Sequence, residues 1–209
     1  PVTGSLDLSL AEAKLIGEEA GDYAGQAVAV GDLNADGLLD LLVGAYKEDS
    51  AGTTSGAAYA MFGPVSGTID LSLSDIKFTA EDSGDEVGYC LAVGDANGDG
   101  YQDTVVPAFG EDTSGSDAGA VYLVLGPVLG SVSLSTADSK LLGESSYDGA
   151  GIRVEMGDVD QYGNEDLVVA AYGDDDAGTT AGAAYLIYGP FSGTASLSAS
   201  AAKLLGEDA

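Results

Sequence analysis

A nine-residue acidic segment recurs three times in this chain at a spacing of 63 residues. In each copy, oxygen-bearing side chains alternate around a glycine, and an apolar run follows directly. The three segments are residues 32–40, 95–103 and 158–166. A fixed repeat of this length is typical of an array of small structural units, each packed against its neighbours. The spacing therefore constrains the fold more tightly than the length of the chain does.

The alternation within each segment predicts a metal site. Short acidic and amide side chains around a tight turn bring several oxygen atoms to one point, which a hard divalent cation requires. The predicted ligands are the side chains at positions 1, 3, 5 and 9 and the backbone carbonyl at position 7. They are Asp32, Asn34, Asp36, Leu38 and Asp40; Asp95, Asn97, Asp99, Tyr101 and Asp103; and Asp158, Asp160, Tyr162, Asn164 and Asp166. The third segment departs from the pattern at position 5, where Tyr162 replaces an Asp. The glycine at position 6 suits a left-handed turn residue.

The available donor atoms favour calcium. Each segment supplies three carboxylates, whereas the chain has no His and a single Cys, Cys90. Such donors disfavour softer transition metals, and Mg²⁺ is less suited because it tends to keep its waters. We therefore expect one Ca²⁺ per segment. An EF-hand is not expected, because valine stands at position 12 where that motif needs a glutamate. The alternative is that Asp, Asn and Gly act only as turn formers.

The net charge restricts the partners. The chain has 35 acidic and 6 basic residues, a net charge of -29. Such a surface repels phosphate backbones and anionic membranes, so we expect no nucleic-acid partner. No apolar stretch is long enough to span a bilayer, so we expect no membrane insertion either.

Prolines mark the period boundaries, because Gly-Pro pairs recur at 63–64, 126–127 and 189–190. The predicted units are residues 1–63, 64–126 and 127–189, and residues 190–209 repeat the phase of 1–20. Four short apolar runs in each unit are typical of strands. In the first unit they are 14–17, 26–30, 41–45 and 57–62, and in the second 77–80, 90–93, 104–108 and 120–125. Residues 71–76 fit either a short helical turn or an extended arm.

Four strands in every period predict an all-β fold in which each unit is one four-stranded antiparallel blade of a β-propeller. A β-helix has much shorter coils, and a helical solenoid needs a 3.6-residue periodicity that these runs lack.

Two further motifs accompany the acidic loops. One is Phe62-Gly63, with Leu125-Gly126 and Tyr188-Gly189 as its relatives. The other is Gly44-Ala45-Tyr46, with Pro107-Ala108-Phe109 and Ala170-Ala171-Tyr172. With the acidic loops, they resemble the FG-GAP repeats of the integrin alpha-subunit propeller and of many bacterial exported proteins. The resemblance covers essentially the whole chain. It implies calcium-binding loops, an extracellular or cell-surface location and no catalytic activity in the propeller itself.

Catalytic residues are hard to find in the sequence. No His is present to activate a nucleophile or transfer protons. Acidic clusters such as residues 18–22 and Glu48-Asp49 recur in every period, which favours surface or ion-binding loops over a unique catalytic pair. We therefore predict that the chain is not an enzyme.

The functional prediction is a calcium-stabilised extracellular module for adhesion or for recognition of a protein or glycan. Three blades are fewer than an integrin-like propeller contains, and they would leave apolar blade faces open to water. Further repeats of a longer chain, or self-association, are expected to cover those faces. The alternative function is a structural subunit that assembles head to tail by strand exchange into a surface layer or filament.

Overall fold

The computed structural model describes residues 7–207, and within this range the chain is all-β, as predicted. The helices of this range are short 3-10 turns, none of them long and apolar enough to cross a membrane. They are η1 (Leu8–Leu10), η2 (Leu71–Leu73), η3 (Leu134–Thr136) and η4 (Leu197–Ala199). The run left open in the sequence, residues 71–76, thus begins with a helical turn. In η2 the Asp70 carboxylate accepts a hydrogen bond from the Ser72 amide at 2.9 Å, which caps the turn.

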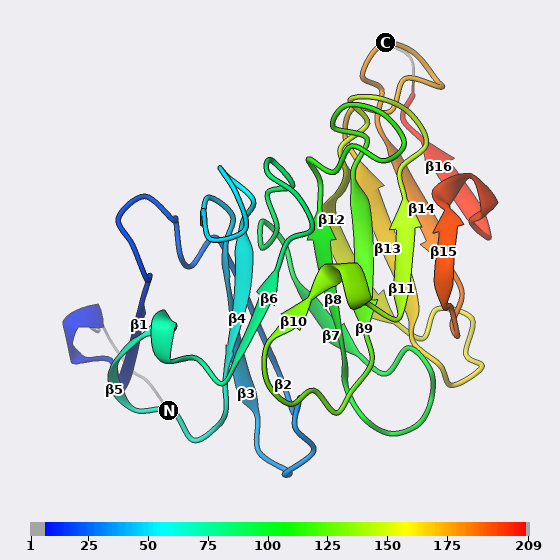
Figure 1. Ribbon diagram of the computed structural model, residues 1–209. Coiled ribbons are helices and arrows are strands. Elements are labelled where there is room, and N and C mark those ends of the chain that lie inside the picture. The colour runs from blue at the N-terminus through cyan, green and yellow to red at the C-terminus, as the bar shows by residue number, and fades with distance from the viewer. Residues whose placement is uncertain (1–6, 208–209) are drawn as a thin grey trace.

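Three sheets stand side by side along the chain (Figure 1). The first contains β2 (Ala27–Gly31), β3 (Asp40–Ala45), β4 (Ala57–Met61), β6 (Ile76–Thr79) and β10 (Val132–Ser133). The second contains β7 (Ala92–Gly94), β8 (Asp103–Ala108), β9 (Ala120–Val124), β11 (Ser139–Leu142) and β15 (Gly193–Ser196). The third contains β12 (Ala150–Gly157), β13 (Asp166–Ala171), β14 (Ala183–Ile187) and β16 (Ala202–Leu205). We call these sheets blades 1, 2 and 3.

The blades are offset from the proline-marked periods. The fourth strand of blade 1 is β6, which comes from the second period and pairs antiparallel with β4. A fifth strand, β10, comes from the third period and pairs parallel with β6. The run 14–17, grouped with the first period in the sequence, forms β1 (Ala13–Ile16) and pairs parallel with β5 (Gly67–Asp70) instead. Each blade therefore receives its outer strands from later periods, which ties neighbouring repeats together.

Apolar side chains fill the space between neighbouring blades. Leu42 and Phe78 of blade 1 pack in one cluster with Val106 and Tyr122 of blade 2. A second cluster joins blades 2 and 3 in the same way. Close approach of the backbones needs small residues, since a Cβ atom added to Gly44 would lie 1.9 Å from the carbonyl oxygen of Gly88.

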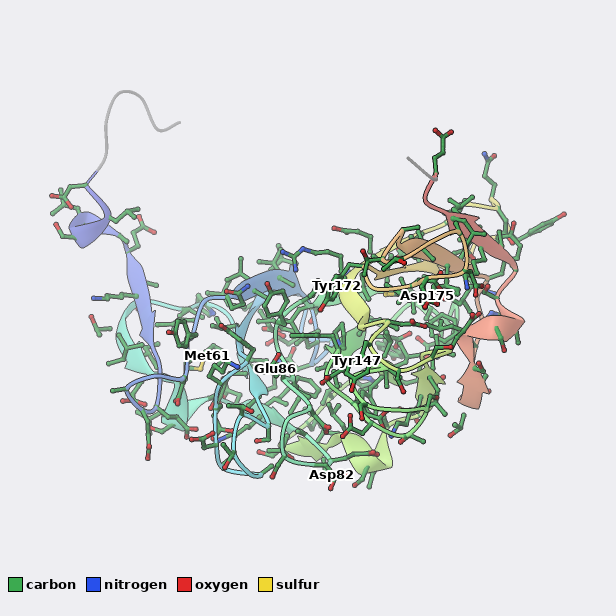
Figure 2. All side chains as sticks on the ribbon, turned by 90° about the horizontal axis from the view of Figure 1, so that it is seen from above. Met61, Asp82, Glu86, Tyr147, Tyr172 and Asp175 are labelled. Carbon is green, nitrogen blue, oxygen red and sulfur yellow. The ribbon has the colours of Figure 1, made fainter. Side chains whose placement is uncertain are left out.

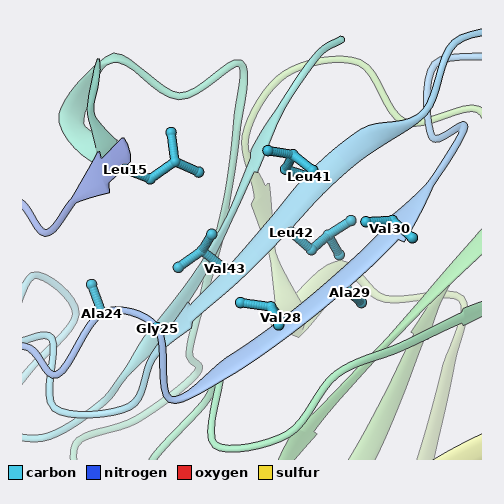
Figure 3. Close-up of a pocket in the computed structure, with 9 residues that line it drawn as sticks. All are labelled: Leu15, Ala24, Gly25, Val28, Ala29, Val30, Leu41, Leu42 and Val43. Carbon is cyan, nitrogen blue, oxygen red and sulfur yellow. The ribbon is translucent and has the colours of Figure 1, made fainter. Parts of the chain in front are cut away.

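The outer face of blade 1 is open and apolar in the part of the chain that the structure describes. Val28 is 72% exposed, whereas the residues that occupy its place in blades 2 and 3, Leu91 and Val154, are 8% and 2% exposed. A hollow of about 570 Å³ lies over this face, lined by Leu15 of β1 and by residues of β2 and β3 (Figure 3). In the other two blades the same positions are covered by the preceding blade.

Candidate metal centres

The three acidic segments form the loops between β2 and β3, β7 and β8, and β12 and β13. All three lie at the same edge of the stack, at the bottom of Figure 1. The paired strands are antiparallel, so each loop closes a hairpin at this end of its blade. We call them metal loops 1, 2 and 3 for residues 32–40, 95–103 and 158–166.

Metal loop 1 is curled around its own acidic side chains. The Asp32 carboxylate accepts hydrogen bonds from the amides of Asp36 and Gly37 at 3.1 and 2.9 Å. The Asn34 side-chain oxygen accepts from the Asp36 amide at 2.9 Å, and Asp36 accepts from the Leu38 amide at 2.8 Å. Side chains 1, 3 and 5 therefore lie on the inside of the turn. Metal loop 2 repeats these bonds with Asp95, Asn97 and Asp99.

The left-handed glycine predicted at position 6 is confirmed in every loop. The φ angles of Gly37, Gly100 and Gly163 are 86°, 89° and 98°. A residue with a side chain would be strained in this region.

Metal loop 3 brings three carboxylates together despite its departure at position 5. Oxygen atoms of Asp158, Asp160 and Asp166 all lie within 4.8 Å of one another. The side chain of Tyr162 points into solvent and is 87% exposed. Asp160 at position 3 therefore supplies the carboxylate that the loop lacks at position 5.

The carboxylate at position 9 has a second role that the sequence did not indicate. Asp40 is fully buried and accepts hydrogen bonds from the amides of Leu33 and Gly63, both at 2.9 Å. Leu33 lies within the loop, whereas Gly63 follows β4, so this one side chain fastens the loop to the end of the third strand. The same pair of bonds occurs at Asp103 and at Asp166. Only the constant distance of 23 residues to a Gly-Pro pair marks this contact in the sequence.

These loops offer a hard cation only oxygen donors. Each contains at least three carboxylates and a backbone carbonyl at position 7, which are the ligands that Ca²⁺ takes. The side chains at positions 1, 3 and 5 lie on the inside of loops 1 and 2, so their donor types fit the predicted ion. Among the three metal loops, however, only loop 3 brings three carboxylates within 4.8 Å of one another.

A second set of acidic residues lies at the opposite end of the blades, where the sequence predicted surface or ion-binding loops. The surface interpretation is wrong for Glu48 and for its equivalents, Glu111 and Asp174, which are only 4%, 4% and 2% exposed. The ion-binding interpretation stays a prediction, and oxygen atoms of Glu144, Asp174 and Asp176 lie within 4.8 Å of one another. Lys77 lies 3.0 Å from Glu48 and 2.5 Å from Glu18, and Tyr59 donates its hydroxyl hydrogen to Glu18 at 2.6 Å. Equivalent groups surround Lys140 and Lys203. The carboxylates are buried because each cluster contains its own cation.

The upper face remains acidic around these clusters. Figure 2, seen from above, labels Asp82, Glu86 and Asp175 on the loops of this face. Beneath Asp82 lies Asp85, which is 3% exposed and accepts a hydrogen bond from the Asp82 amide at 2.9 Å. Burial raises the pKa of Asp85 to about 6, the amide of Asp82 opposes this shift, and the nearby charge of Glu111 adds to it.

Replacing Asp85 with asparagine is expected to increase stability near pH 7. Its folded pKa lies above the unfolded value of 3.8, so its contribution is present at low pH and is lost as pH rises through about 6. Removing the charge should restore about 3 kcal/mol at pH 7 and flatten the dependence between pH 4 and 6. Urea unfolding at several pH values measures this. Asp82→Asn, a change at an exposed neighbour, is the control, and an equal effect of both variants would contradict the burial argument.

Known proteins resemble this chain over much of its length. Residues 24–61 match the family model of the FG-GAP repeat. The chain is 36% identical over 169 residues to Integrin alpha-IIb of Mus musculus, covering 77% of the chain and 16% of that protein. It is 32% identical over 173 residues to Integrin alpha-4 of Xenopus laevis, covering 77% and 15%. It is also 32% identical over 150 residues to Phosphatidylinositol-glycan-specific phospholipase D of Rattus norvegicus, covering 68% and 18%. The aligned region thus spans less than a fifth of each relative.

Proposed function

Because the chain belongs to the FG-GAP repeat family of β-propeller proteins, we propose that it is a calcium-stabilised extracellular module for adhesion or for recognition of a protein or glycan. The observation that carries this proposal is the row of oxygen-lined loops at one edge of the stack, with the same internal hydrogen bonds in loops 1 and 2. The similarity to two integrin alpha chains supports the adhesion part.

Calcium would be held by the side chains at positions 1, 3, 5 and 9 of each loop and by the carbonyls of Leu38, Tyr101 and Asn164. The ion supplies positive charge that offsets the repulsion among carboxylates crowded into one turn. In metal loop 3 we propose that Asp160 replaces the contribution of position 5. Extracellular calcium modules bind with dissociation constants of about 0.1 to 1 mM, which suits loops as exposed as these.

We propose no catalytic role for this chain. One relative is named as a phospholipase D, but less than a fifth of that protein aligns with this chain. The buried carboxylates Glu48, Glu111 and Asp174 are paired with lysines, which supports a structural role for them.

A second candidate function, a subunit that assembles head to tail, is favoured by the open face of blade 1. Val28 and Val30 are 72% and 57% exposed there, although both are apolar and lie on a strand of the sheet. β1 and β5 stand beside this face as a separate two-stranded sheet, so a strand from another chain could pair with the free edge of β1.

Light scattering with and without EDTA separates the two candidates. A recognition module is expected to remain one small species in millimolar calcium, and beads coated with it should bind extracellular-matrix proteins or glycans and release them in EDTA. A head-to-tail subunit is expected to form large particles whose size falls when calcium is removed. Large particles would therefore contradict the recognition module, and bead binding that survives EDTA would contradict its dependence on calcium.

A further inference from the structure

The metal loops contact one another across the blade boundaries through the residue at position 8. The side-chain oxygen of Gln102, at this position in metal loop 2, accepts a hydrogen bond from the Asp32 amide of metal loop 1 at 2.7 Å. The two residues are 70 apart in the sequence. Asp32 is the first predicted ligand of its loop, and Gln102 stands between two predicted ligands of its own, Tyr101 and Asp103.

The backbone leaves room for this contact. A Cβ atom added to Gly31 would lie 2.5 Å from the Gln102 side-chain oxygen. A glycine before Asp32 is therefore needed for the Gln102 side chain to reach the Asp32 amide. Residues of both loops, among them Asp32 and Gln102, surround a shared hollow of about 270 Å³.

At the next junction a charged side chain takes the place of Gln102, but among the described residues the Asp95 amide donates no hydrogen bond to it. A Cβ atom added to Gly94, which precedes Asp95, would lie 1.8 Å from a carboxylate oxygen of Glu165, the residue at position 8 of metal loop 3. The Glu165 amide also donates a hydrogen bond to the Asp95 carbonyl at 2.8 Å. Gln102 and Glu165 thus occupy equivalent places, but only Glu165 brings a negative charge to the loop that it contacts.

We propose that the side chain at position 8 is a positioning residue for the metal loop of the preceding repeat, and that this contact couples the calcium affinities of neighbouring loops. Gln102 holds the backbone of Asp32, whose carboxylate in turn accepts from the amides of Asp36 and Gly37. Asp103 is already held by the amides of Ala96 and Gly126. Calcium bound in metal loop 2 restrains the rest of the loop, and with it the Gln102 side chain next to Tyr101. Binding at loop 2 thus strengthens binding at loop 1, and the reverse holds by linkage. This inference rests on the proposed calcium function and adds its regulation.

The charge of Glu165 sets an order of filling. Its carboxylate lies beside the first ligand residue of metal loop 2, where a negative charge attracts a cation, whereas the neutral amide of Gln102 lies beside loop 1. Loop 2 therefore fills at lower calcium than loop 1.

Replacing Gln102 with alanine is expected to weaken calcium binding at the neighbouring loop. The amide signals of Gly37 and Gly100 report loops 1 and 2 separately in ¹H–¹⁵N spectra during a calcium titration. The midpoint for Gly37 should move to about tenfold higher calcium, while that for Gly100 moves much less. Gln102→Glu keeps the acceptor oxygen and adds charge, so it should restore or lower the midpoint for Gly37. The matched control is Leu39→Ala. Leu39 occupies position 8 of metal loop 1, and its side chain is 64% exposed.

A second measurement needs no metal. In calcium-free protein, Gln102→Ala should speed hydrogen exchange of the Asp32 amide, because its acceptor is removed, while exchange at Asp95 stays unchanged. Unaltered exchange at Asp32, or midpoints of Gly37 and Gly100 that shift equally, would overturn the proposal. If neither glycine of the parent protein responds to calcium, the calcium function itself fails. If the parent responds and the variant matches it, only the coupling fails.

Discussion

Calcium at one hundred times its dissociation constant is expected to raise the free energy of unfolding by about 8 kcal/mol, since each of three loops contributes about 2.7 kcal/mol at that concentration. In a chain of this size the melting temperature should rise by roughly 20 °C. The physical reason is that only the folded loop brings its carboxylates to one point. With a net charge of -29, the folded chain also gains more from bound cations than a neutral protein would. Thermal unfolding followed by circular dichroism in calcium and in EDTA measures the difference.

Asp36→Ala provides the control for this effect. Asp36 is exposed, and among residues 7–207 its carboxylate accepts hydrogen bonds only from its own loop, from the Leu38 amide and the Asn34 side chain. The variant should melt at a lower temperature than the parent in calcium and at nearly the same temperature in EDTA. Equal melting temperatures of the two proteins in calcium would show that metal loop 1 binds no calcium.

The repeat unit could be predicted from the sequence, but its boundaries in space could not. Short apolar runs at 26–30, 41–45 and 57–62 predicted three strands, which the structure confirms as β2, β3 and β4. The run 14–17 also forms a strand, β1, but its pairing with β5 could not be predicted. A repeat has the same period wherever its start is placed, so spacing alone cannot say that β6 rather than β1 pairs with β4.

The strands β5, β10 and β15 show a different limit. Their sequences are short and polar, such as Gly67–Asp70, and carry no apolar alternation. They form because they pair with an outer strand that another repeat has already placed, for example β11 beside β15. Such strands follow from tertiary contacts rather than from local pattern.

The same distinction applies to the candidate metal centres. The turn at position 6 is a local property of glycine, so the sequence predicted it correctly. The contact between Gln102 and Asp32 spans 70 residues, and the pairing of Lys77 with Glu18 spans 59. Neither pair has a sequence signature within one loop. Burial of Glu48 could not be predicted either, because the lysine that compensates its charge comes from the next period.

Asp103→Ala is expected to destabilise the protein by about 4 kcal/mol even in EDTA, which distinguishes position 9 from the other positions of the loop. Asp103 is fully buried and accepts hydrogen bonds from the amides of Ala96 and Gly126 at 2.9 and 2.8 Å. Alanine would leave both donors inside the protein without an acceptor. Urea unfolding in EDTA measures the loss, and Asp99→Ala, an exposed change in the same loop, should cost far less.

The position 9 carboxylate therefore acts before any ion binds. Burial raises the pKa of the Asp103 carboxyl, whereas the amides of Gly126 and Ala96 lower it, so the two hydrogen bonds are what makes a charged group tolerable at this depth. In this way the end of β9 holds Asp103 without an ion, so we expect calcium to order only the remaining part of metal loop 2. Equal losses for Asp103→Ala and Asp99→Ala in EDTA would show instead that the loop is organised by the ion alone.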